Sequence, residues 1–493
     1  MSTQDTQSKK PFYITTTLPY VNSDPHIGFG LEVLQADALA RYKRLMGHDV
    51  FFTTGTDEHG QKIAQKADEA GKHRQEYVDH YAGEFNRLKE GLDLSYNNFI
   101  RTTDAKHLVA AQELWQRCDA QGDIYKKNYK GLYCVGCEVY IKEADLVDGK
   151  CADHPTTPLE EIEEENYFFK LSNYQGYLEE YLSQDGVILP EWRRKEALAF
   201  VQNGLEDFSI SREVSRMDWG IPVPGDEGHV MYVWFDALTN YISTLGWPCC
   251  TTPGVHESDC LFKKFWEEGD TFQVAGKDQV RFQSIIWQAM LKSGGLPATD
   301  KVLYHGFINS GGQKMSKSIG NVISPYELVE RYGTEATRYI LLRHVHPFDD
   351  SDVTWEKMDE WYTANLVNGI GNLVARVMKM AETHLSEPIE QPQISGFDNA
   401  YTEALESYNI QQACDVIWKK VGELDERIAS EQPFKVIKED MEVGIKMIQS
   451  LVHDLYIIGR MLYPILPEAN KIIKESILQN KKPENMFGRL EVR

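Results

Sequence analysis

Long apolar runs are missing from this chain of 493 residues, and none approaches the roughly 20 residues that a membrane helix needs. Residues 1–10 are polar and carry no hydrophobic segment of the kind that marks a secretory signal. The eight cysteines are too few for a disulfide scaffold in a chain of this length. We therefore expect a cytoplasmic protein with no membrane partner, in which residues 1–10 form a disordered lead-in.

Positive charge is also scarce. The chain has 52 Lys and Arg residues against 75 Asp and Glu residues, which gives a net charge of -23. This balance argues against a non-specific nucleic-acid binder, because phosphate contacts need clustered Lys and Arg, although it leaves room for a local basic surface. The hydrophobic fraction of 42% is that of an ordinary globular protein, and the length suggests roughly three or four domains.

Five of the eight cysteines show no pattern typical of metal ligands. Cys118, Cys249, Cys250 and Cys260 lack ligand spacing, and Cys414 lies in a helical pattern. We interpret all five as ordinary buried or half-buried residues, because free cysteine is among the most buried residue types.

The remaining three cysteines and His154 form two pairs with the spacing of metal ligands. Cys134 and Cys137 are separated by two residues, as are Cys151 and His154, and 13 residues lie between the two pairs. Four soft or borderline ligands with this spacing predict one tetrahedral Zn²⁺. Because all four positions are filled by the protein, we expect a structural zinc knuckle, within about residues 131–157, rather than a catalytic metal.

The N-terminal part alternates between strand and helix patterns. The β-branched and aromatic segment Phe12–Thr17 predicts a buried strand, and Val50–Thr53 predicts a second one. Between them, Asp24 is expected to cap a helix that has Pro25 in its first turn and runs to about Leu45. This order predicts a parallel sheet with a right-handed crossover.

The alternation is interrupted between about residues 120 and 225. It resumes with three apolar segments that we expect in the same sheet pattern, Met231–Phe235, Thr271–Val274 and Val302–Tyr304. From about Trp361 onward the pattern is all-helical, with Pro388–Pro392 as a linker.

Two short motifs stand at opposite ends of this α/β region. His26-Ile27-Gly28 lies in the first turn of the predicted helix, where free backbone N–H groups and the helix dipole favour anions. The segment from Lys314 to Ser318 reads Lys-Met-Ser-Lys-Ser and follows Gly311-Gly312, which can supply hinge freedom. Together, the two motifs resemble the signatures with which class I aminoacyl-tRNA synthetases bind ATP.

Further motifs make the chain similar to the methionyl-tRNA synthetases over nearly its whole length. They are, besides the one-zinc knuckle and the lysine-serine loop, Leu18-Pro19-Tyr20-Val21-Asn22, Gly55-Thr56-Asp57-Glu58-His59-Gly60, Trp219-Gly220-Ile221-Pro222-Val223-Pro224, Trp234-Phe235-Asp236-Ala237 and Gly276-Lys277-Asp278. The interruption spans only about 100 residues, which is too short for the editing insertion of the valine, isoleucine and leucine enzymes.

The resemblance implies an α/β protein with a Rossmann-type, doubly wound parallel nucleotide-binding domain. A connective domain with the zinc knuckle is inserted into it, and an all-α anticodon-binding bundle follows. The implied boundaries are 11–120 and 229–325 for the two catalytic halves, 121–228 for the insertion, 326–360 for a stem-contact segment just after the lysine-serine loop, and 361–493 for the bundle.

The implied reaction converts methionine and ATP to methionyl-adenylate and pyrophosphate, then transfers the methionyl group to the 3′-terminal adenosine of tRNA(Met). Mg²⁺ is expected to accompany ATP. Catalysis of the first step rests on positioning and on neutralising charge, which suits mobile lysines. The residues implied to be catalytic are His26, Gly28, Lys314, Ser316, Lys317 and Ser318.

The resemblance also implies binding residues for both small substrates. Asp57 is expected to bind the α-ammonium group of methionine, and an aromatic wall suits its thioether. The full set implied for methionine is Leu18, Tyr20, Asp57, Trp234, Ala237, Tyr241, Gln279, Phe282 and Gln283. The set implied for ATP is His26, Gly28, Gly276, Lys277, Asp278 and Lys317.

In the helical part, Asn372 and Arg376 match the family positions that read the anticodon, and a spacing of four places them on one helix face. Pro433-Phe434 matches a family Pro-Trp pair, whose ring can stack on an unpaired base. Taken without the resemblance, Phe434 is a predicted core residue.

Four positions depart from the family pattern. Phe29 replaces the second histidine of the first signature, Gln279 replaces an aliphatic residue, Gln283 replaces a histidine, and Phe434 replaces tryptophan. Two alternatives therefore stay open, an inhibitor-resistant paralogue with an altered pocket and a non-catalytic tRNA-binding regulator. The chain stops soon after the bundle, without the further domain that dimerises some relatives, so we expect a monomer.

Overall fold

The computed structural model describes residues 9–135, 139–141, 146–152, 155, 157–248, 260–315, 320–394 and 396–490, with the backbone alone at residues 139 and 314. The chain divides into two compact units. The first consists of residues 1–25, 48–87 and 96–304, and the second of residues 26–47, 88–95 and 305–493. No helix within the described ranges has both the length and the apolar character needed to cross a membrane.

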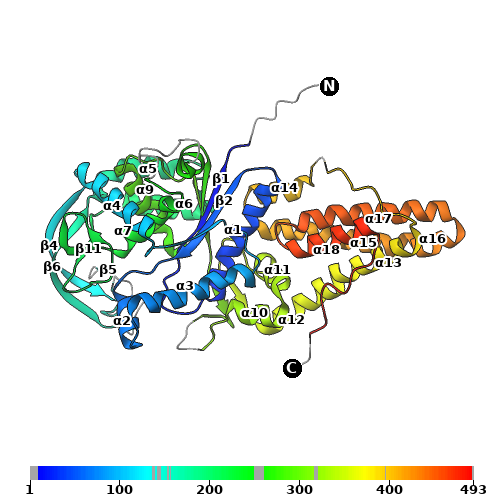
Figure 1. The fold of residues 1–493 in the computed structure, drawn as a ribbon, viewed down its shortest axis with the longest axis horizontal. Helices are drawn as coiled ribbons and strands as arrows, with labels where there is room; N and C mark the ends of the chain where they lie inside the picture. The colour runs from blue at the N-terminus through cyan, green and yellow to red at the C-terminus, as the bar shows by residue number, and fades with distance from the viewer. Residues whose placement is uncertain are drawn as a thin grey trace, which may run out of the picture. The chain divides into compact units, whose positions relative to one another are not determined.

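The first unit is built around a sheet with the strand order β3-β2-β1-β12-β13-β7, of which Figure 1 labels the neighbouring strands β1 and β2. Its strands are β1 (Phe12–Thr16), β2 (Val50–Thr56), β3 (Asn98–Arg101), β7 (Ile188–Leu189), β12 (Asp270–Gly276) and β13 (Lys301–His305). The central strand β1 runs parallel to both neighbours, and Phe12 pairs with Val50 on one side and with Asp270 on the other. All five residues of β1 are buried, which explains its unbroken run of β-branched and aromatic residues. The predicted parallel sheet is therefore confirmed.

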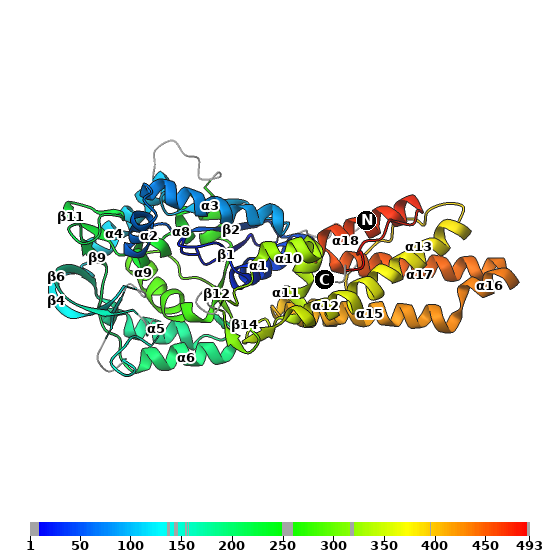
Figure 2. The same ribbon diagram turned by 90° about the horizontal axis from the view of Figure 1, so that it is seen from below.

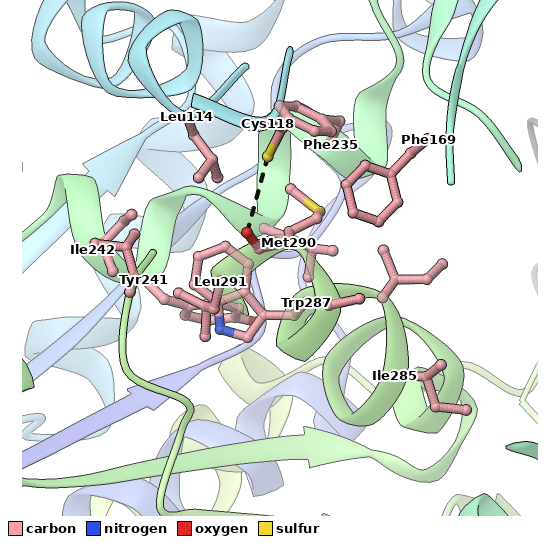
Figure 3. Close-up of a cluster of buried hydrophobic side chains, with 14 of the residues drawn as sticks. Leu114, Cys118, Phe169, Phe235, Tyr241, Ile242, Ile285, Trp287, Met290 and Leu291 are labelled. Atoms are coloured by element: carbon pink, nitrogen blue, oxygen red, sulfur yellow. Dashed lines mark hydrogen bonds between the residues drawn. The ribbon is translucent and has the colours of Figure 1, made fainter. Parts of the chain in front are cut away.

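Helices of the first unit enclose an apolar core beside this sheet. They are α2 (Gln61–Glu69), α3 (Arg74–Gly91, which continues into the second unit), α4 (Ala105–Ala120), α5 (Gln175–Ser183), α6 (Glu191–Gln202), α7 (Val233–Leu238), α8 (Asn240–Ser243) and α9 (Trp287–Ser293). Figure 3 shows Leu114 and Cys118 of α4 facing Met290 and Leu291 of α9 across this core. The thiol of Cys118 lies 3.9 Å from the carbonyl oxygen of Met290.

Antiparallel strands occupy the region where the sequence pattern is interrupted. One sheet has the order β5-β4-β6-β8 and another the order β10-β11-β9. Their bounds are β4 (Ile124–Cys134), β5 (Val139–Ile141), β6 (Leu159–Phe169), β8 (Phe208–Ser209), β9 (Ser211–Glu213), β10 (Pro222–Val223) and β11 (Asp226–Met231). The long ribbon of β4 and β6 is paired over its whole length, from Ile124 with Phe169 to Cys134 with Leu159.

The second unit is mostly helical. Its helices are α1 (Ile27–Leu45), α10 (Pro325–Tyr332), α11 (Thr334–His344), α12 (Trp355–Trp361), a π-helical segment Tyr362–Gly371, α13 (Asn372–His384), α14 (Asn399–Glu406), α15 (Ile410–Glu431), α16 (Pro433–Glu439), α17 (Met441–Leu462) and α18 (Pro467–Gln479). Figure 2 shows α13, α15 and α17 lying side by side. A small sheet joins β14 (Ile308–Ser310), β15 (Gln313–Lys314) and β16 (Ser351–Val353).

Two local predictions were wrong. Helix α1 begins at Ile27 with His26, not Asp24, as its N-cap, because the His26 ring accepts the hydrogen bond from the Gly28 N–H. Met231–Phe235 is not a strand, since β11 ends at Met231 and α7 begins at Val233. A short run of apolar residues shows neither the alternation of a strand nor the repeat of a helix, so it is compatible with both.

Two further residues differ from their predicted environment. Phe434 is 41% exposed, so it is not a core residue. Cys118 and Cys414 are buried free cysteines as expected, whereas the buried Cys260 is disulfide-bonded. Spacing along the chain does not predict such a bond, because the fold decides which cysteines meet. Cys249 and Cys250 lie outside the described residues.

Candidate active site

The segments that follow β1 and β2 lie side by side at the carboxyl end of the sheet. Tyr20 and Asp57 form a parallel bridge, in which the Asp57 N–H donates to the Pro19 carbonyl at 3.0 Å and the Val21 N–H donates to the Asp57 carbonyl at 3.2 Å. The carboxyl end of a parallel sheet is where ligands bind in open α/β folds. This arrangement brings together Leu18, Tyr20 and Asp57, three of the residues predicted for methionine.

A buried carboxylate connects the Asp57 segment to helix α7. Asp236 Oδ2 lies 2.7 Å from His59 Nδ1, and its Oδ1 lies 2.8 Å from His107 Nε2. His107 Nδ1 in turn lies 2.8 Å from the hydroxyl of Ser243. Burial acts to raise the pKa of Asp236, but the two imidazole rings outweigh it and hold the pKa below its ordinary value. The site therefore contains a charged aspartate at the centre of a fixed polar network.

Helix α7 presents an aromatic stack beside this network. The ring of Trp234 lies on the ring of Phe282, with 3.6 Å between centroids and 14° between planes. Ala237, on the same helix, is buried. A nearly face-to-face stack of this kind presents a flat, polarizable surface, which is what a thioether favours.

Gln283 and Tyr241 form the polar side of the same region. Gln283 Nε2 donates to the Tyr241 hydroxyl at 2.5 Å, and the Tyr13 hydroxyl donates to the Tyr241 carbonyl at 2.8 Å. Gln283 is buried, and among the described residues its Oε1 has no hydrogen-bond donor. A buried amide at this position, where the family pattern has a histidine, keeps this side of the region polar.

The end of β12 leads directly into the segment predicted for ATP. Gly276 is the last residue of β12, and Lys277–Gln279 form a 3-10 turn. Gln279 Nε2 donates to Asp278 Oδ2 at 2.9 Å. The amide of Gln279 is thus hydrogen-bonded to Asp278, whereas the amide of Gln283 contacts Tyr241.

In the second unit, His26 and Gly28 are in contact at the start of α1. The Gly28 N–H donates to His26 Nδ1 at 3.0 Å, and the Ile27 N–H donates to the Ile323 carbonyl at 3.0 Å. A Cβ at position 28 would lie 2.8 Å from the imidazole Cε1 of His26, so glycine lets this ring stay where it is and a larger residue would displace it. The next residue, Phe29, is buried.

The start of the lysine-serine loop is a tight hairpin. Ser310 pairs with Gln313 between β14 and β15, and Gly311 and Gly312 turn the chain with φ of 63° and 76°. Glycine is the residue that adopts two successive positive φ values without strain. The Lys314 side chain and the residues Ser316, Lys317 and Ser318 lie outside the described residues.

Half of the predicted zinc knuckle is described. Cys134, the last residue of β4, pairs with Val139 of β5, and Cys151 follows a tight turn in which Val147 bridges to Lys150. Both cysteines are buried. Cys137 and His154 lie outside the described residues, and within those residues no group of three His, Cys, Asp or Glu side chains could hold a metal ion.

The helical part contains a basic hollow of about 470 Å³. Arg376 of α13 and Phe434 of α16 both line it, together with Lys379, His384 and Lys482. Arg376 also pairs with Asp425 of α15. Asn372 is exposed one turn before Arg376, and Pro433 is the first residue of α16, so the four predicted residues come from two neighbouring helix starts.

Comparisons with known proteins agree with this geometry. The sequence profile described as "tRNA synthetases class I (M)" matches residues 12–157 and 142–378. The methionine--tRNA ligase of Thermotoga maritima is 38% identical over 96% of this chain and 76% of its own length. That of Brucella suis is 39% identical over 94% and 90%. The chain belongs to the methionyl-tRNA synthetases.

A solved methionyl-tRNA synthetase has the same fold. The Mycobacterium tuberculosis enzyme in complex with methionyl-adenylate superimposes with a TM-score of 0.86, at 36% identity, over 95% of this chain and 94% of its own. Its free form superimposes with a TM-score of 0.81, at 31% identity, over 98% and 99%.

Some polar residues at this methionyl-tRNA synthetase site were not predicted from the sequence. His107 and Asp236 are paired in the structure, and Arg101 donates to both carboxylate oxygens of buried Glu58 at 2.6 and 2.8 Å. The Trp219 indole N–H donates to the Glu58 carbonyl at 2.6 Å. Asp236, Glu58 and Trp219 stand in the motifs that carry the resemblance, but His107 and Arg101 have no such signal.

Proposed function

We propose that the chain is an active methionine–tRNA ligase, which forms methionyl-adenylate and then methionyl-tRNA(Met) for initiation and elongation of translation. The observation that carries this proposal is the ring stack of Trp234 on Phe282, in a chain of this family, together with the Gln283–Tyr241 contact. A solved relative binds methionyl-adenylate, and that relative shares 36% of its residues with this chain.

In the proposed methionine site, the carboxylate of Asp57 binds the α-ammonium group. Leu18, Tyr20, Trp234, Ala237, Tyr241 and Phe282 surround the thioether side chain. Gln279 and Gln283 belong to the proposed set, and support is stronger for Gln283, because its amide contacts Tyr241 whereas that of Gln279 contacts Asp278.

In the proposed ATP site, Gly276, Lys277 and Asp278 contact the adenosine. His26, Gly28, Lys314, Ser316, Lys317 and Ser318 act on the phosphates. One methionine carboxylate oxygen attacks the α-phosphorus, and the bond to the bridging oxygen of pyrophosphate breaks. The lysine cations stabilise the negative charge that develops on pyrophosphate, and Mg²⁺ bound with ATP supplies further neutralisation. The Phe29 side chain cannot donate a hydrogen bond, so it adds nothing to this stabilisation, which relies more on His26 and the lysines.

The second step transfers the methionyl group to tRNA. A ribose hydroxyl of the terminal adenosine attacks the methionyl carbonyl carbon, and AMP leaves. We propose that Asn372, Arg376, Pro433 and Phe434 recognise the anticodon. Support comes from the exposed ring of Phe434 beside Arg376 in one basic hollow, where an unpaired base can stack.

We propose one structural Zn²⁺ on Cys134, Cys137, Cys151 and His154. Support comes from Cys134 and Cys151, two buried thiols, of which Cys151 follows a tight turn. Metal analysis is expected to find one zinc per chain. Cys134→Ala is expected to lose it, whereas Cys118→Ala, at a buried thiol outside the knuckle, keeps it.

The remaining predictions belong to the same proposal. They are the domain boundaries given above, a monomeric and cytoplasmic enzyme, and, as alternatives, an inhibitor-resistant paralogue or a regulator without activity. Intact motifs at Asp57 and at Lys314 to Ser318 favour activity over the regulator.

Methionine-dependent exchange of pyrophosphate into ATP tests the function. We expect exchange with methionine and at least about 100-fold less with leucine or valine, because a shaped pocket discriminates between side chains of different shape. Lys317→Ala is expected to lose exchange while tRNA still binds. Absence of exchange at saturating methionine would remove the enzyme proposal and favour the regulator.

A further inference from the structure

Residues 218–221, between β9 and β10, belong to none of the sites proposed above, although they overlap one of the motifs that carry the resemblance. Trp219, in this segment, is half-buried and donates its indole N–H to the Glu58 carbonyl oxygen at 2.6 Å. Glu58 lies 161 residues earlier in the chain and directly follows Asp57. The segment therefore contacts the part of the chain that we propose to bind the α-ammonium group of methionine.

Trp219 contacts the residues after Asp57 in three ways. Besides the bond from its indole to Glu58, its own carbonyl oxygen accepts a hydrogen bond from the Gly60 N–H at 3.1 Å. Its ring also meets the His59 ring edge to face, with 5.6 Å between centroids and 63° between planes. Trp219 thus holds the backbone on both sides of His59.

The indole bond cannot be replaced easily. Glu58 is completely buried, so water does not reach its carbonyl oxygen. Its N–H is already bound, because it donates to the Thr102 hydroxyl at 2.9 Å. Loss of the indole N–H would leave a buried acceptor without this donor, and such groups are costly in folded proteins. We therefore expect the backbone next to Asp57 to shift when this one N–H is removed.

The same segment is bonded to the strand that leads into the aromatic side of the proposed pocket. The Met231 N–H donates to the Ile221 carbonyl oxygen at 2.7 Å, and Met231 is the last residue of β11. Helix α7, which carries Trp234, begins two residues later. Residues 218–221 therefore connect the two chain segments that supply Asp57 and Trp234.

Two further contacts keep the segment in place. Asp218 pairs with Arg74, the first residue of α3. Gly220 packs closely on β11, because an added Cβ would lie 3.2 Å from the Cβ of Val230. A larger residue at position 220 would therefore push the segment away from this strand.

We propose that Trp219 is a positioning residue for methionine. Its indole N–H and ring hold residues 58–60 so that the Asp57 carboxylate meets the α-ammonium group, and it acts through Asp57 rather than by contacting the substrate. This inference rests on the proposed function, because it assumes that the chain activates methionine and that Asp57 binds its ammonium group.

The test uses W219F, which keeps an aromatic ring and removes the indole N–H. The matched control is W418F, since Trp418 donates its indole N–H to the Asn365 carbonyl oxygen at 3.3 Å in the helical part of the chain. Each variant thus loses one bond of the same kind. Pyrophosphate exchange gives kcat and the KM values for methionine and ATP. It also gives the inhibition constant of γ-(methylthio)butyrate, which is methionine without its amino group.

We expect W219F to raise the KM for methionine by about 3- to 30-fold, the scale of a buried hydrogen bond that is left unmade. The kcat and the KM for ATP are expected to change by less than about twofold, because the loss concerns binding of methionine alone. The inhibition constant of γ-(methylthio)butyrate is also expected to change by less than about twofold, since this analogue has no ammonium group for Asp57. W418F is expected to match the wild type in all of these values.

Gly220→Ala gives the same test without removing a polar group, and it decides the question if W219F does not fold. The added Cβ must displace residues 218–221 from β11 and Trp219 with them. We expect the KM for methionine to rise while the inhibition constant of the analogue stays within about twofold.

Two outcomes would overturn the inference. One is an unchanged KM for methionine in a folded W219F. The other is binding of γ-(methylthio)butyrate that is weakened as much as binding of methionine, because Trp219 would then support the pocket in general and not the contact made by Asp57. A wild-type chain without methionine-dependent exchange would refute the proposed function instead.

Discussion

A single buried carboxylate, Asp236, joins three segments that lie far apart in the sequence. Its two oxygens contact His59, which follows β2, and His107 of α4, while Asp236 itself belongs to α7. Helix α7 also carries Trp234 and Ala237. The network therefore fixes the aromatic side of the proposed pocket relative to the segment that holds Asp57.

Asp236→Asn is expected to weaken methionine binding. An amide cannot balance two imidazole N–H groups, and breaking a buried charged network costs about 3–5 kcal/mol in unfolding free energy. We expect the KM for methionine in exchange to rise at least about tenfold, and the KM for ATP to change less. Steady-state exchange kinetics and chemical denaturation measure both effects.

Asp226→Asn is the matched control. Asp226 also pairs with a histidine, His229 at 3.1 Å, and with Lys126 at 2.8 Å, but its side chain is partly exposed. A KM for methionine that rises equally in both variants would contradict a positioning role for Asp236.

Gly28→Ala is expected to lower activation without lowering stability. The added Cβ would lie 2.8 Å from the His26 ring, which must then move and lose its hydrogen bond to position 28. Alanine otherwise favours a helix over glycine by about 1 kcal/mol. Gly30→Ala, where the nearest heavy atom lies at 3.6 Å, is the control that should keep its exchange rate. Equal exchange rates for the two variants would show that the His26 position is not needed.

The residue types of the site could be predicted from motifs, but their partners could not. The segment from Asp57 to His59 points to a polar site, yet nothing in it names Asp236 as the partner of His59, because the contact spans 177 residues of sequence. His107 carries no motif at all. Only the packing of α4 against α8 brings its ring to Ser243 and Asp236.

At the scale of elements, the sequence predicts those helices and strands whose pattern of apolar residues is regular and long enough to distinguish one from the other. The strand β1, the end of α1 at Leu45 and the strand β2 follow from clear patterns. The helix α7 does not, since a six-residue element shows less than two helical turns of its pattern. Its first residues, Val233 to Phe235, are as apolar as a strand.

Helix α11 ends in a histidine that is expected to make stability depend on pH. The ring of His344 stacks on Trp361, with 4.2 Å between centroids. Burial, followed by the nearby Arg343 guanidinium, lowers the pKa of His344 to about 3. Below about pH 6.5, the ordinary pKa of histidine, His344 is protonated in the unfolded chain but stays neutral in the folded chain. Stability is therefore lost as pH falls from about 6.5 towards about 3.

His344→Gln removes this contribution. Between pH 7.5 and 5.5, we expect the wild type to lose up to about 1 kcal/mol more stability than the variant. Thermal unfolding followed by circular dichroism at the two pH values measures the difference. His453→Gln, at a half-exposed histidine of α17, is expected to behave as the wild type. A variant whose pH dependence equals that of the wild type would contradict the lowered pKa.

At the scale of the whole molecule, an acidic protein must bind an acidic RNA. The net charge of -23 repels phosphates at long range, so the RNA contact that we propose at the basic hollow requires its local cations, Arg376, Lys379 and Lys482. Each phosphate that such a cation neutralises contributes a slope of roughly -0.7 to the dependence of log K on log[salt] for single-stranded RNA.

Lys482→Ala is therefore expected to weaken tRNA(Met) binding at low salt and to reduce this slope by roughly 0.7. Titrations at several KCl concentrations measure it. Lys446→Ala is the control, because Lys446 is exposed on α17, pairs with Glu442 and lies outside the hollow. An unchanged slope for Lys482→Ala would exclude a phosphate contact at this residue.

The pairing of β1 with β12 has a consequence for synthesis on the ribosome. Phe12 finds its partner only at Asp270, so the inner edge of β1 stays without its second neighbour until that residue has emerged. At typical elongation rates this takes roughly 10 to 50 s. For that time, a strand that is buried in the folded protein is open on one side and can pair with another nascent chain. Slow translation or premature termination before β12 is therefore the stage at which this protein is most prone to aggregate.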